Sequence, residues 1–166
     1  MTPSPEKNPR RMRLLQVLEP SGGGSGRHFI DLCQGMKARG HEVHAVYSPV
    51  RAESRFVEEL TSLDLAGVHI VAMARSPGPS DLPAWHALRA VIRKAGPFDV
   101  IHGHSSKAGA LSRLRLPGHH VPRVYTPHAF RTMDPGLGAL GHKIYGAIEK
   151  LLARGFTERL ICVSAD

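Results

Sequence analysis

Residues 14–28 read LLQVLEPSGGGSGRH, and the rest of the chain is interpreted outward from this stretch. Its apolar start, residues 14–18, predicts a buried strand, and four glycines among residues 22–26 predict a turn before a helix. Glycine lacks a Cβ, so the backbone of such a turn takes positive φ and approaches a ligand closely. At the start of a helix, free N–H groups and the helix dipole favour a phosphate or a carboxylate. The turn is therefore predicted either to bind an anion or to be a flexible glycine–serine loop.

Short apolar strands alternate with helices along the whole chain. We expect strands at residues 13–19, 43–47, 68–72, 98–102, 121–126 and 160–163. We expect helices at residues 27–39, 54–65, 82–95 and 137–153, and a shorter one after Lys107. This alternation predicts an α/β fold, a Rossmann-like doubly wound parallel sheet of about six strands with helices on both faces. Such sheets bind ligands beyond the carboxyl ends of their strands.

Length and composition indicate one globular domain. With 166 residues, 42% of them hydrophobic, the chain is long enough to bury a core. We expect residues 1–12 to be a disordered tail and residues 13–166 to form the domain. No run approaches the roughly 18 apolar residues of a membrane span, and the charged start is no secretory signal, so we expect a cytoplasmic protein. Cys33 and Cys162 are expected to be small buried apolar residues.

The net charge of +8 is concentrated in two places. The chain carries +3 before Leu14, and residues 100–133 carry +5 with five histidines and no acidic residue. We therefore expect a positive region that binds an anionic ligand or surface and gains charge under mild acid. Tyr125 and Phe130 are its only aromatic platforms and it has no recognition-helix motif, so phosphate on a small molecule or a lipid is favoured over nucleic acid.

Three polar segments are expected to meet at the carboxyl edge of the sheet. They are the glycine turn, residues 102–107 (HGHSSK) and residues 126–130 (TPHAF). Strand periodicity places His102 and His104 on the same side, but no Cys, Asp or Glu nearby completes a metal site, so no metal is expected. His128 is either a loop histidine satisfied by the backbone or a ligand contact, and its position after a strand favours the ligand contact.

The long helix at residues 137–153 carries an apolar stripe. Leu140, Ile144, Ile148 and Leu151 lie on it, and the charged residues lie away from it. This pattern predicts a helix that faces the core with the stripe and exposes its other side to solvent.

Three competing motifs are missing from the chain. A dinucleotide-binding Gly-x-Gly-x-x-Gly would need glycine at Phe29, and a nucleophile elbow around Ser25 would need glycine at Arg27. The Gly-Lys-Ser/Thr of a P-loop does not occur. Kinase-like and esterase chemistry are therefore not indicated.

Several pieces together resemble a known family. In chain order they are the glycine turn with His28, RGHEV at 39–43, DVIHGHSSKAG at 99–109, YTPH at 125–128, IEK at 148–150 and ICVS at 161–164. Their order and spacing resemble the N-terminal domain of retaining glycosyltransferases of family 4, which have the GT-B fold. The HSSKAG and TPH pieces look most like enzymes that build cell-surface polysaccharides.

The resemblance implies an enzyme that moves a sugar from a nucleotide-sugar to a polyprenyl-linked or glycan acceptor, with no metal or other cofactor. By the match to the family, the donor diphosphate would lie against Gly22, Gly23 and Gly24. His128 would be the catalytic residue that contacts the donor sugar. The acceptor-binding residues would be His28, His104, Ser105, Ser106 and Lys107.

The resemblance also implies partners. In enzymes of this family, a C-terminal domain that residues 13–166 do not contain holds the leaving diphosphate and the nucleotide. We therefore expect the chain alone to be inactive. Further sequence or a separate polypeptide would complete it. Lys107 with Arg113 or Arg115 would meet the diphosphate of a lipid-linked acceptor, and with Arg123 these residues would attach the protein to the inner, anionic face of the membrane. A solvated helix face is the alternative for Arg113 and Arg115. The alternative function is a non-catalytic α/β module that binds an anionic sugar or lipid headgroup.

Overall fold

The structure, a computed structural model, describes residues 10–115, 120–133 and 135–163. The expected disordered tail, apart from residues 10–12, lies outside the described residues. Among the described residues, no helix combines the length and the apolar character needed to cross a bilayer.

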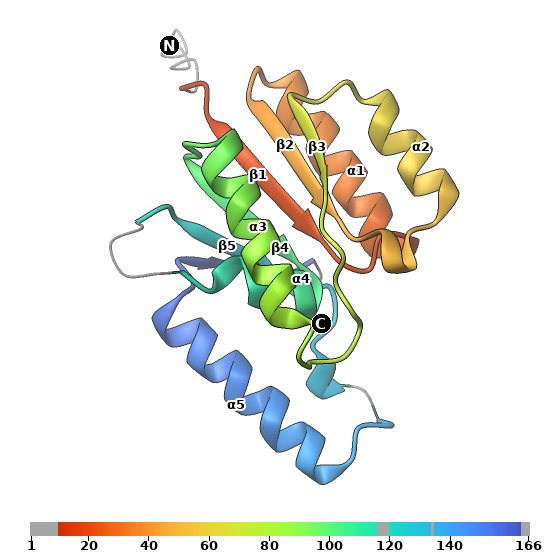
Figure 1. The fold of residues 1–166 in the computed structure, drawn as a ribbon, viewed down its shortest axis with the longest axis vertical. Helices are drawn as coiled ribbons and strands as arrows, with labels where there is room; N and C mark the ends of the chain where they lie inside the picture. Colours follow the sequence, from red (N-terminus) through yellow and green to blue (C-terminus); the bar gives the residue numbers. More distant parts are fainter. Residues whose placement is uncertain (1–9, 116–119, 134, 164–166) are drawn as a thin grey trace, which may run out of the picture.

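The core of the protein is one sheet of six parallel strands in the order β3-β2-β1-β4-β5-β6 (Figure 1). The strands are β1 (Arg13–Leu18), β2 (Glu42–Tyr47), β3 (Gly67–Ile70), β4 (Val100–His104), β5 (Arg123–Thr126) and β6 (Arg159–Leu160). The chain builds the sheet outward from β1 to β3 and then crosses back to place β4 on the other side of β1. The predicted doubly wound parallel sheet is confirmed, and its switch point lies between β1 and β4.

Helices cover both faces of this sheet (Figure 1). They are α1 (Gly23–Ala38), α2 (Ser54–Ser62), α3 (Asp81–Ala95), α4 (Ser105–Arg113) and α5 (Ala139–Gly155), with short 3-10 segments at Pro49–Arg51 and Arg131–Met133. Successive residues of a strand point to opposite faces. Leu14 and Leu18 therefore pack into the cluster under α1 and α2, whereas Leu15 and Val17 pack into the cluster under α3 and α4.

Two element boundaries near the carboxyl edge differ from the sequence expectation. Helix α1 begins at Gly23, so most of the expected glycine turn is the first turn of the helix. Strand β4 extends to His104 and α4 begins at Ser105, so residues 102–107 are not a loop. Ser105 makes this direct change with a φ of 64°, in the left-handed region. A run of small and polar residues looks like a loop in sequence, but here the strand pairing of His102 to His104 with β1 and β5 overrides that preference.

The prediction that the apolar stripe of α5 faces the core is wrong. Leu140, Ile144 and Leu151 are 71%, 47% and 65% exposed, and Leu152 is the fully buried residue of the helix. The helix lies beside α4 at one end of the molecule, away from the sheet (Figure 1). Cys33 is buried as expected, but Cys162 is exposed, because it follows the edge strand β6, where no further strand of the described chain covers it.

Candidate functional site

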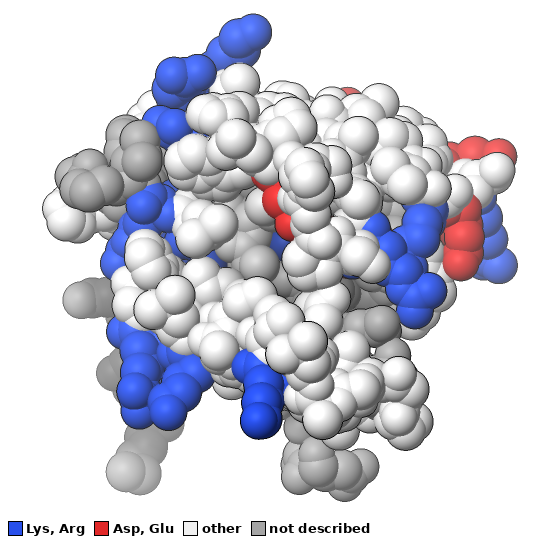
Figure 2. Space-filling view, turned by 60° about the horizontal axis from the view of Figure 1, so that its bottom comes forward, with Lys and Arg blue, Asp and Glu red and all other residues white. Residues whose placement is uncertain are grey.

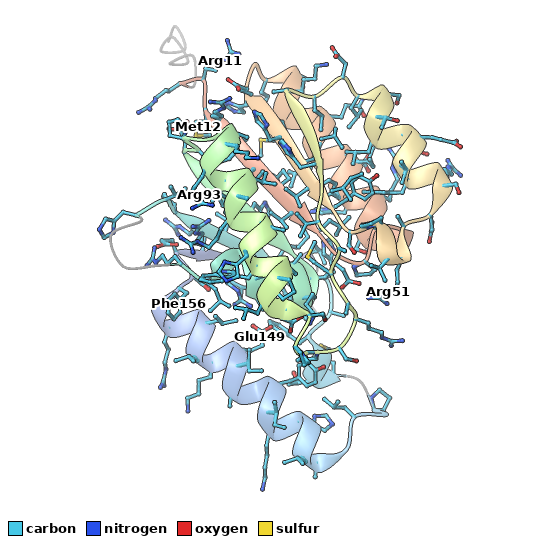
Figure 3. All side chains as sticks on the ribbon, viewed as in Figure 1. Arg11, Met12, Arg51, Arg93, Glu149 and Phe156 are labelled. Atoms are coloured by element: carbon cyan, nitrogen blue, oxygen red, sulfur yellow. The ribbon has the colours of Figure 1, made fainter. Side chains whose placement is uncertain are left out.

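The carboxyl ends of β1, β4 and β5 meet at one edge of the sheet, where a pocket of about 510 Å³ opens. Ser25 of α1, Lys107 of α4 and His128 after β5 all line this pocket. Arg51 also lines it and lies at the same edge in Figure 3. The structure therefore brings together the three segments that the sequence placed at this edge.

Three histidines from three different elements form a cluster there. The Nδ1 of His104 lies 3.3 Å from the Nε2 of His128, and the ring centroid of His28 lies 5.0 Å from that of His128 and 5.9 Å from that of His104. His28 belongs to α1, His104 ends β4, and His128 follows β5. We call these three residues the histidine cluster. His102, two residues before His104 on the same side of the strand, extends it with a centroid separation of 4.0 Å.

Gln16 of β1 fixes the orientation of the central ring. Its Oε1 accepts a hydrogen bond of 2.9 Å from the buried Nε2 of His104, which leaves Nδ1 with a lone pair directed toward His128. Thr126 plays a similar part for His102, with 2.8 Å between its Oγ1 and the Nε2 of that ring. Sequence reasoning did not find Gln16, although a single polar residue inside an apolar strand was the available signal.

Burial keeps these imidazoles neutral. Desolvation lowers the pKa of His102 and of His128 to about 4, with a smaller contribution from the neighbouring histidines. The same causes lower the pKa of His104 well below its ordinary value. The expectation that these histidines add positive charge under mild acid is therefore wrong. Neutral imidazoles donate or accept hydrogen bonds, as a hydroxyl-rich ligand requires.

The backbone of His128 is strained. Its φ is 59°, in the left-handed region that residues other than glycine, asparagine and aspartate seldom adopt. The second such residue at this edge is Ser105, at the start of α4. Strain of this kind concentrates at functional sites.

Lys107, which the sequence predicts to bind an acceptor, lines the pocket, but its charge is already paired. Its Nζ is 2.5 Å from Asp81 Oδ1 and donates to the carbonyl of Ser76 at 2.8 Å. The side chain is buried and joins α4 to the segment before α3. Ser105 and Ser106 line the same pocket as Lys107. The ring of His104 contacts that of His128, another residue of the pocket, so His104 lies beside residues 105–107. Their role in binding an acceptor stays a prediction.

The glycines expected to hold the donor diphosphate face a different hollow. Gly22 and Gly23 line a pocket of about 220 Å³ beside Glu53, and the N–H of Gly23 donates to Glu53 Oε1 at 3.0 Å. Gly23 has a φ of +57°, and a Cβ on Gly22 would lie 2.5 Å from the Glu53 carboxyl. The first turn of α1 thus already holds an anionic group. The phosphate role of Gly22, Gly23 and Gly24 stays a prediction, and it requires the Glu53 carboxylate to move away.

Four basic residues of this stretch whose side chains the structure describes, Lys107, Arg113, Arg115 and Arg123, do not form an exposed patch. Arg113 is 1% exposed, bonds Glu149 at 2.9 Å and lies over the Tyr125 ring. Arg115 bonds Glu158 at 2.7 Å, and Arg123 is buried. The prediction that these residues and Lys107 attach the protein to a membrane is wrong, and so is the alternative of a solvated face for Arg113. The stretch lacks acids in sequence, but the fold supplies them from α3, from α5 and from Glu158, the residue before β6.

The histidine cluster is also the group in the described chain that could hold a metal ion. Each histidine offers one ring nitrogen, and these atoms lie within 4.8 Å of one another. Neutral rings, with Gln16 fixing the N–H of His104, are the form in which histidine binds metals. From the sequence, His102 and His104 were the candidate metal-binding pair, and His28 and His128 were not included. The expectation of a metal-free site stays a prediction.

Comparison with known proteins identifies the class. Residues 22–166 match the sequence profile of Glycosyltransferase Family 4, and the chain belongs to this family. A comparison with curated proteins finds no significant match.

Solved structures show the same fold. The chain is similar to a glycosyltransferase from Rickettsia africae (19% identity, TM-score 0.63), covering 93% of this chain and 37% of that one. It is similar to MurG from Acinetobacter baumannii (12%, TM-score 0.64, 92% and 42%) and to sucrose-phosphate synthase from Thermosynechococcus elongatus (12%, TM-score 0.61, 92% and 48%). The chain spans less than half the length of each of these proteins. The fold is accordingly the Rossmann-like N-terminal half of a GT-B glycosyltransferase.

Proposed function

We propose that this chain is the acceptor-side domain of a retaining glycosyltransferase of the hexosyltransferase type, which moves a sugar from a nucleotide-sugar to a lipid-linked or glycan acceptor in cell-surface polysaccharide synthesis. The observation that carries the proposal is the histidine cluster beside the pocket of about 510 Å³, at the sheet edge where the fold binds its ligands. Membership of the glycosyltransferase family supplies the reaction class.

The polar groups at the pocket suit a sugar. His128 and the hydroxyls of Ser105 and Ser106 offer neutral donors and acceptors, which match hydroxyl groups better than they match a charged headgroup. His128 would contact the donor sugar, held in place by His104 and, through it, by Gln16. The alternative of a module for anionic headgroups is less well supported, because two of the three cations that line the pocket, Arg51 and Lys107, are already paired with Glu19 and Asp81, and Arg75 is the third.

The ion pairs of Arg51 and Lys107 also limit which charges can assist catalysis. Transfer from a nucleotide-sugar develops negative charge on the leaving diphosphate, and enzymes stabilise it with free cations or N–H groups. Two of the pocket's three cations are engaged with carboxylates, which leaves Arg75 alone for the diphosphate, so we propose that turnover requires a second domain, on the same or a separate polypeptide, and no metal or other cofactor. Under this proposal the chain alone binds substrate weakly and does not turn over.

We propose that the protein works in the cytoplasm at the inner face of the membrane, with α5 as the attachment surface. Leu140, Ile144 and Leu151 form its exposed apolar stripe, and Lys143 and Lys150 flank the stripe. The acid of the helix, Glu149, turns inward to Arg113 and Tyr125. Figure 2 shows blue side chains beside an uncharged surface on this face. Such a helix lies in the interface of an anionic bilayer.

The sugar site is tested by saturation-transfer NMR on the whole chain with UDP-glucose, UDP-galactose and GDP-mannose as probes. We expect the hexose protons of at least one probe to receive saturation, and His128→Asn to remove it, because asparagine tolerates the left-handed backbone but lacks the ring. His86→Asn, at an exposed histidine of α3, is the matched control. Saturation that is unchanged in His128→Asn would contradict the proposal.

A further inference from the structure

A second pocket, with a largely apolar wall and four arginines around it, lies at the opposite, amino edge of the sheet. It has a volume of about 50 Å³ and lies between α3, the end of α4 and the start of β5. Four arginines line it: Arg89 and Arg93 from α3, Arg115 after α4, and Arg123, the first residue of β5. Figure 3 labels Arg93 on the side of α3 that faces β5. We call this hollow the arginine pocket.

Arg123 is the central observation. The residue is 4% exposed, and its Nε and Nη1 have no hydrogen-bond partner in the structure as far as it is described. A buried guanidinium with two unpartnered N–H groups is costly, because those groups have left water without gaining an equivalent contact. Burial, together with the charge of Arg115, lowers the pKa of Arg123 to about 10, so the group is still protonated at neutral pH.

The surrounding residues neutralise this charge only in part, because the effect of the Glu158 carboxylate, which raises the pKa of Arg123, is smaller than that of burial. Glu158 is the carboxylate at this place, and it bonds the side chain of Arg115 and the backbone N–H of Arg123 rather than the Arg123 guanidinium. Arg89 lies over the ring of Trp85 at 4.8 Å, and Arg93 is exposed. Four arginines therefore lie around one carboxylate, and Arg123, whose Nε and Nη1 have no partner among the described residues, is one of the residues that line the pocket.

The volume of the pocket and the geometry of guanidinium groups indicate which ligand would fit. Guanidinium groups bind tetrahedral oxyanions through paired N–H donors. A pocket of about 50 Å³ admits one such group and excludes a base or a sugar. We propose that the arginine pocket binds a single phosphoryl group, either free phosphate or the end of a phosphomonoester. The bound group would neutralise Arg123 at the start of β5, the strand that ends beside His128.

The proposal is independent of the sugar site, which lies at the other edge of the sheet. Inorganic phosphate and, separately, glycerol 3-phosphate are titrated into the whole chain by calorimetry, at constant ionic strength balanced with chloride. Binding of both would assign the site to the phosphoryl group of a larger molecule, and binding of inorganic phosphate alone would assign it to the free ion.

Variants locate the binding. Arg93→Gln removes an exposed lining residue without a folding cost, and we expect about tenfold weaker binding from the loss of one charge-assisted contact. Lys94→Gln, the exposed neighbour on the same helix that does not line the pocket, should bind like the wild type. Arg123→Met should abolish binding and remove the dependence of the thermal midpoint on phosphate.

Two results would overturn the proposal. Equal phosphate affinity in the wild type, Arg93→Gln and Arg123→Met would place the bound ion elsewhere, for example at the first turn of α1. No phosphate binding at all, with a thermal midpoint that rises in Arg123→Met, would show that only water occupies the pocket. If Arg123→Met does not fold, the comparison of Arg93→Gln with Lys94→Gln still decides.

Discussion

At the scale of single residues, the site depends on histidines that the fold keeps uncharged. His102, His104 and His128 come from β4 and the segment after β5, and burial lowers the pKa of each. In the unfolded chain the same rings have pKa values near 6.5. The unfolded state therefore binds more protons than the folded state below about pH 6.5.

This difference predicts that stability falls in mild acid. The free energy of unfolding should decrease as pH drops from 6.5 toward 4, and His102 alone contributes up to about 3 kcal/mol over that window. The measurement is urea unfolding at several pH values. His102→Gln, which keeps a hydrogen-bonding group for Thr126, should flatten the slope. An unchanged slope in this variant would show that His102 is not buried in its neutral form.

A second prediction concerns Gln16. Gln16→Leu leaves the Nε2–H of His104 buried without an acceptor, which costs about 1–3 kcal/mol. Urea unfolding of the variant measures this loss. Gln34→Leu, at an exposed position of α1, is the matched control and should change stability by less than about 0.5 kcal/mol. Equal losses of unfolding free energy in the two variants would contradict the hydrogen bond from His104 to Gln16.

At the scale of elements, the strands follow from the apolar runs of the sequence, and α5 does not follow from its apolar stripe. Periodicity shows which residues share a helix face, but a stripe that packs on the core and a stripe that lies on a membrane have the same period. The direction of Glu149 decides between them here. Its bonds to Arg113 and Tyr125 turn the side of the helix that lies opposite the apolar stripe toward α4. These residues are too far apart in sequence for their contact to be predicted from it.

The exposed stripe predicts salt-sensitive attachment to anionic vesicles. Ile144→Gln with Leu151→Gln should reduce co-sedimentation strongly, and Lys143→Gln with Lys150→Gln should weaken it by about 1 kcal/mol for each charge. Leu82→Gln, at an exposed apolar residue of α3, is the control. Equal binding to neutral vesicles, or attachment that survives both double variants, would contradict the role of α5.

At the scale of the whole molecule, the sheet topology was predictable and the distribution of charge was not. Alternating strands and helices imply a parallel sheet, and strand ends bring the glycine turn, His104 and His128 to one edge. The charges counted along the sequence predicted a basic surface at residues 100–133. In the folded molecule Lys107 and Arg113 are buried against acids from α3 and α5, because the packing of helices brings together residues that are distant in sequence.

The cluster of three histidines makes the metal content a separate test. We expect the purified chain to hold no stoichiometric metal by mass spectrometry and to keep its saturation-transfer signal after dialysis against EDTA. One zinc per chain, lost in His28→Ala, would show instead that the cluster is a metal site.

The central claim is that His128 contacts the sugar with the rest of the histidine cluster behind it, and long-range ¹H–¹⁵N NMR of the imidazole rings tests it most directly. On titration with the nucleotide-sugar that shows saturation transfer, we predict that the resonances of His28, His104 and His128 shift together, while those of the exposed His86 on α3 and of the half-buried His142 on α5 do not. Shifts confined to residues outside the cluster, with the three rings unchanged at saturating ligand, would contradict the account.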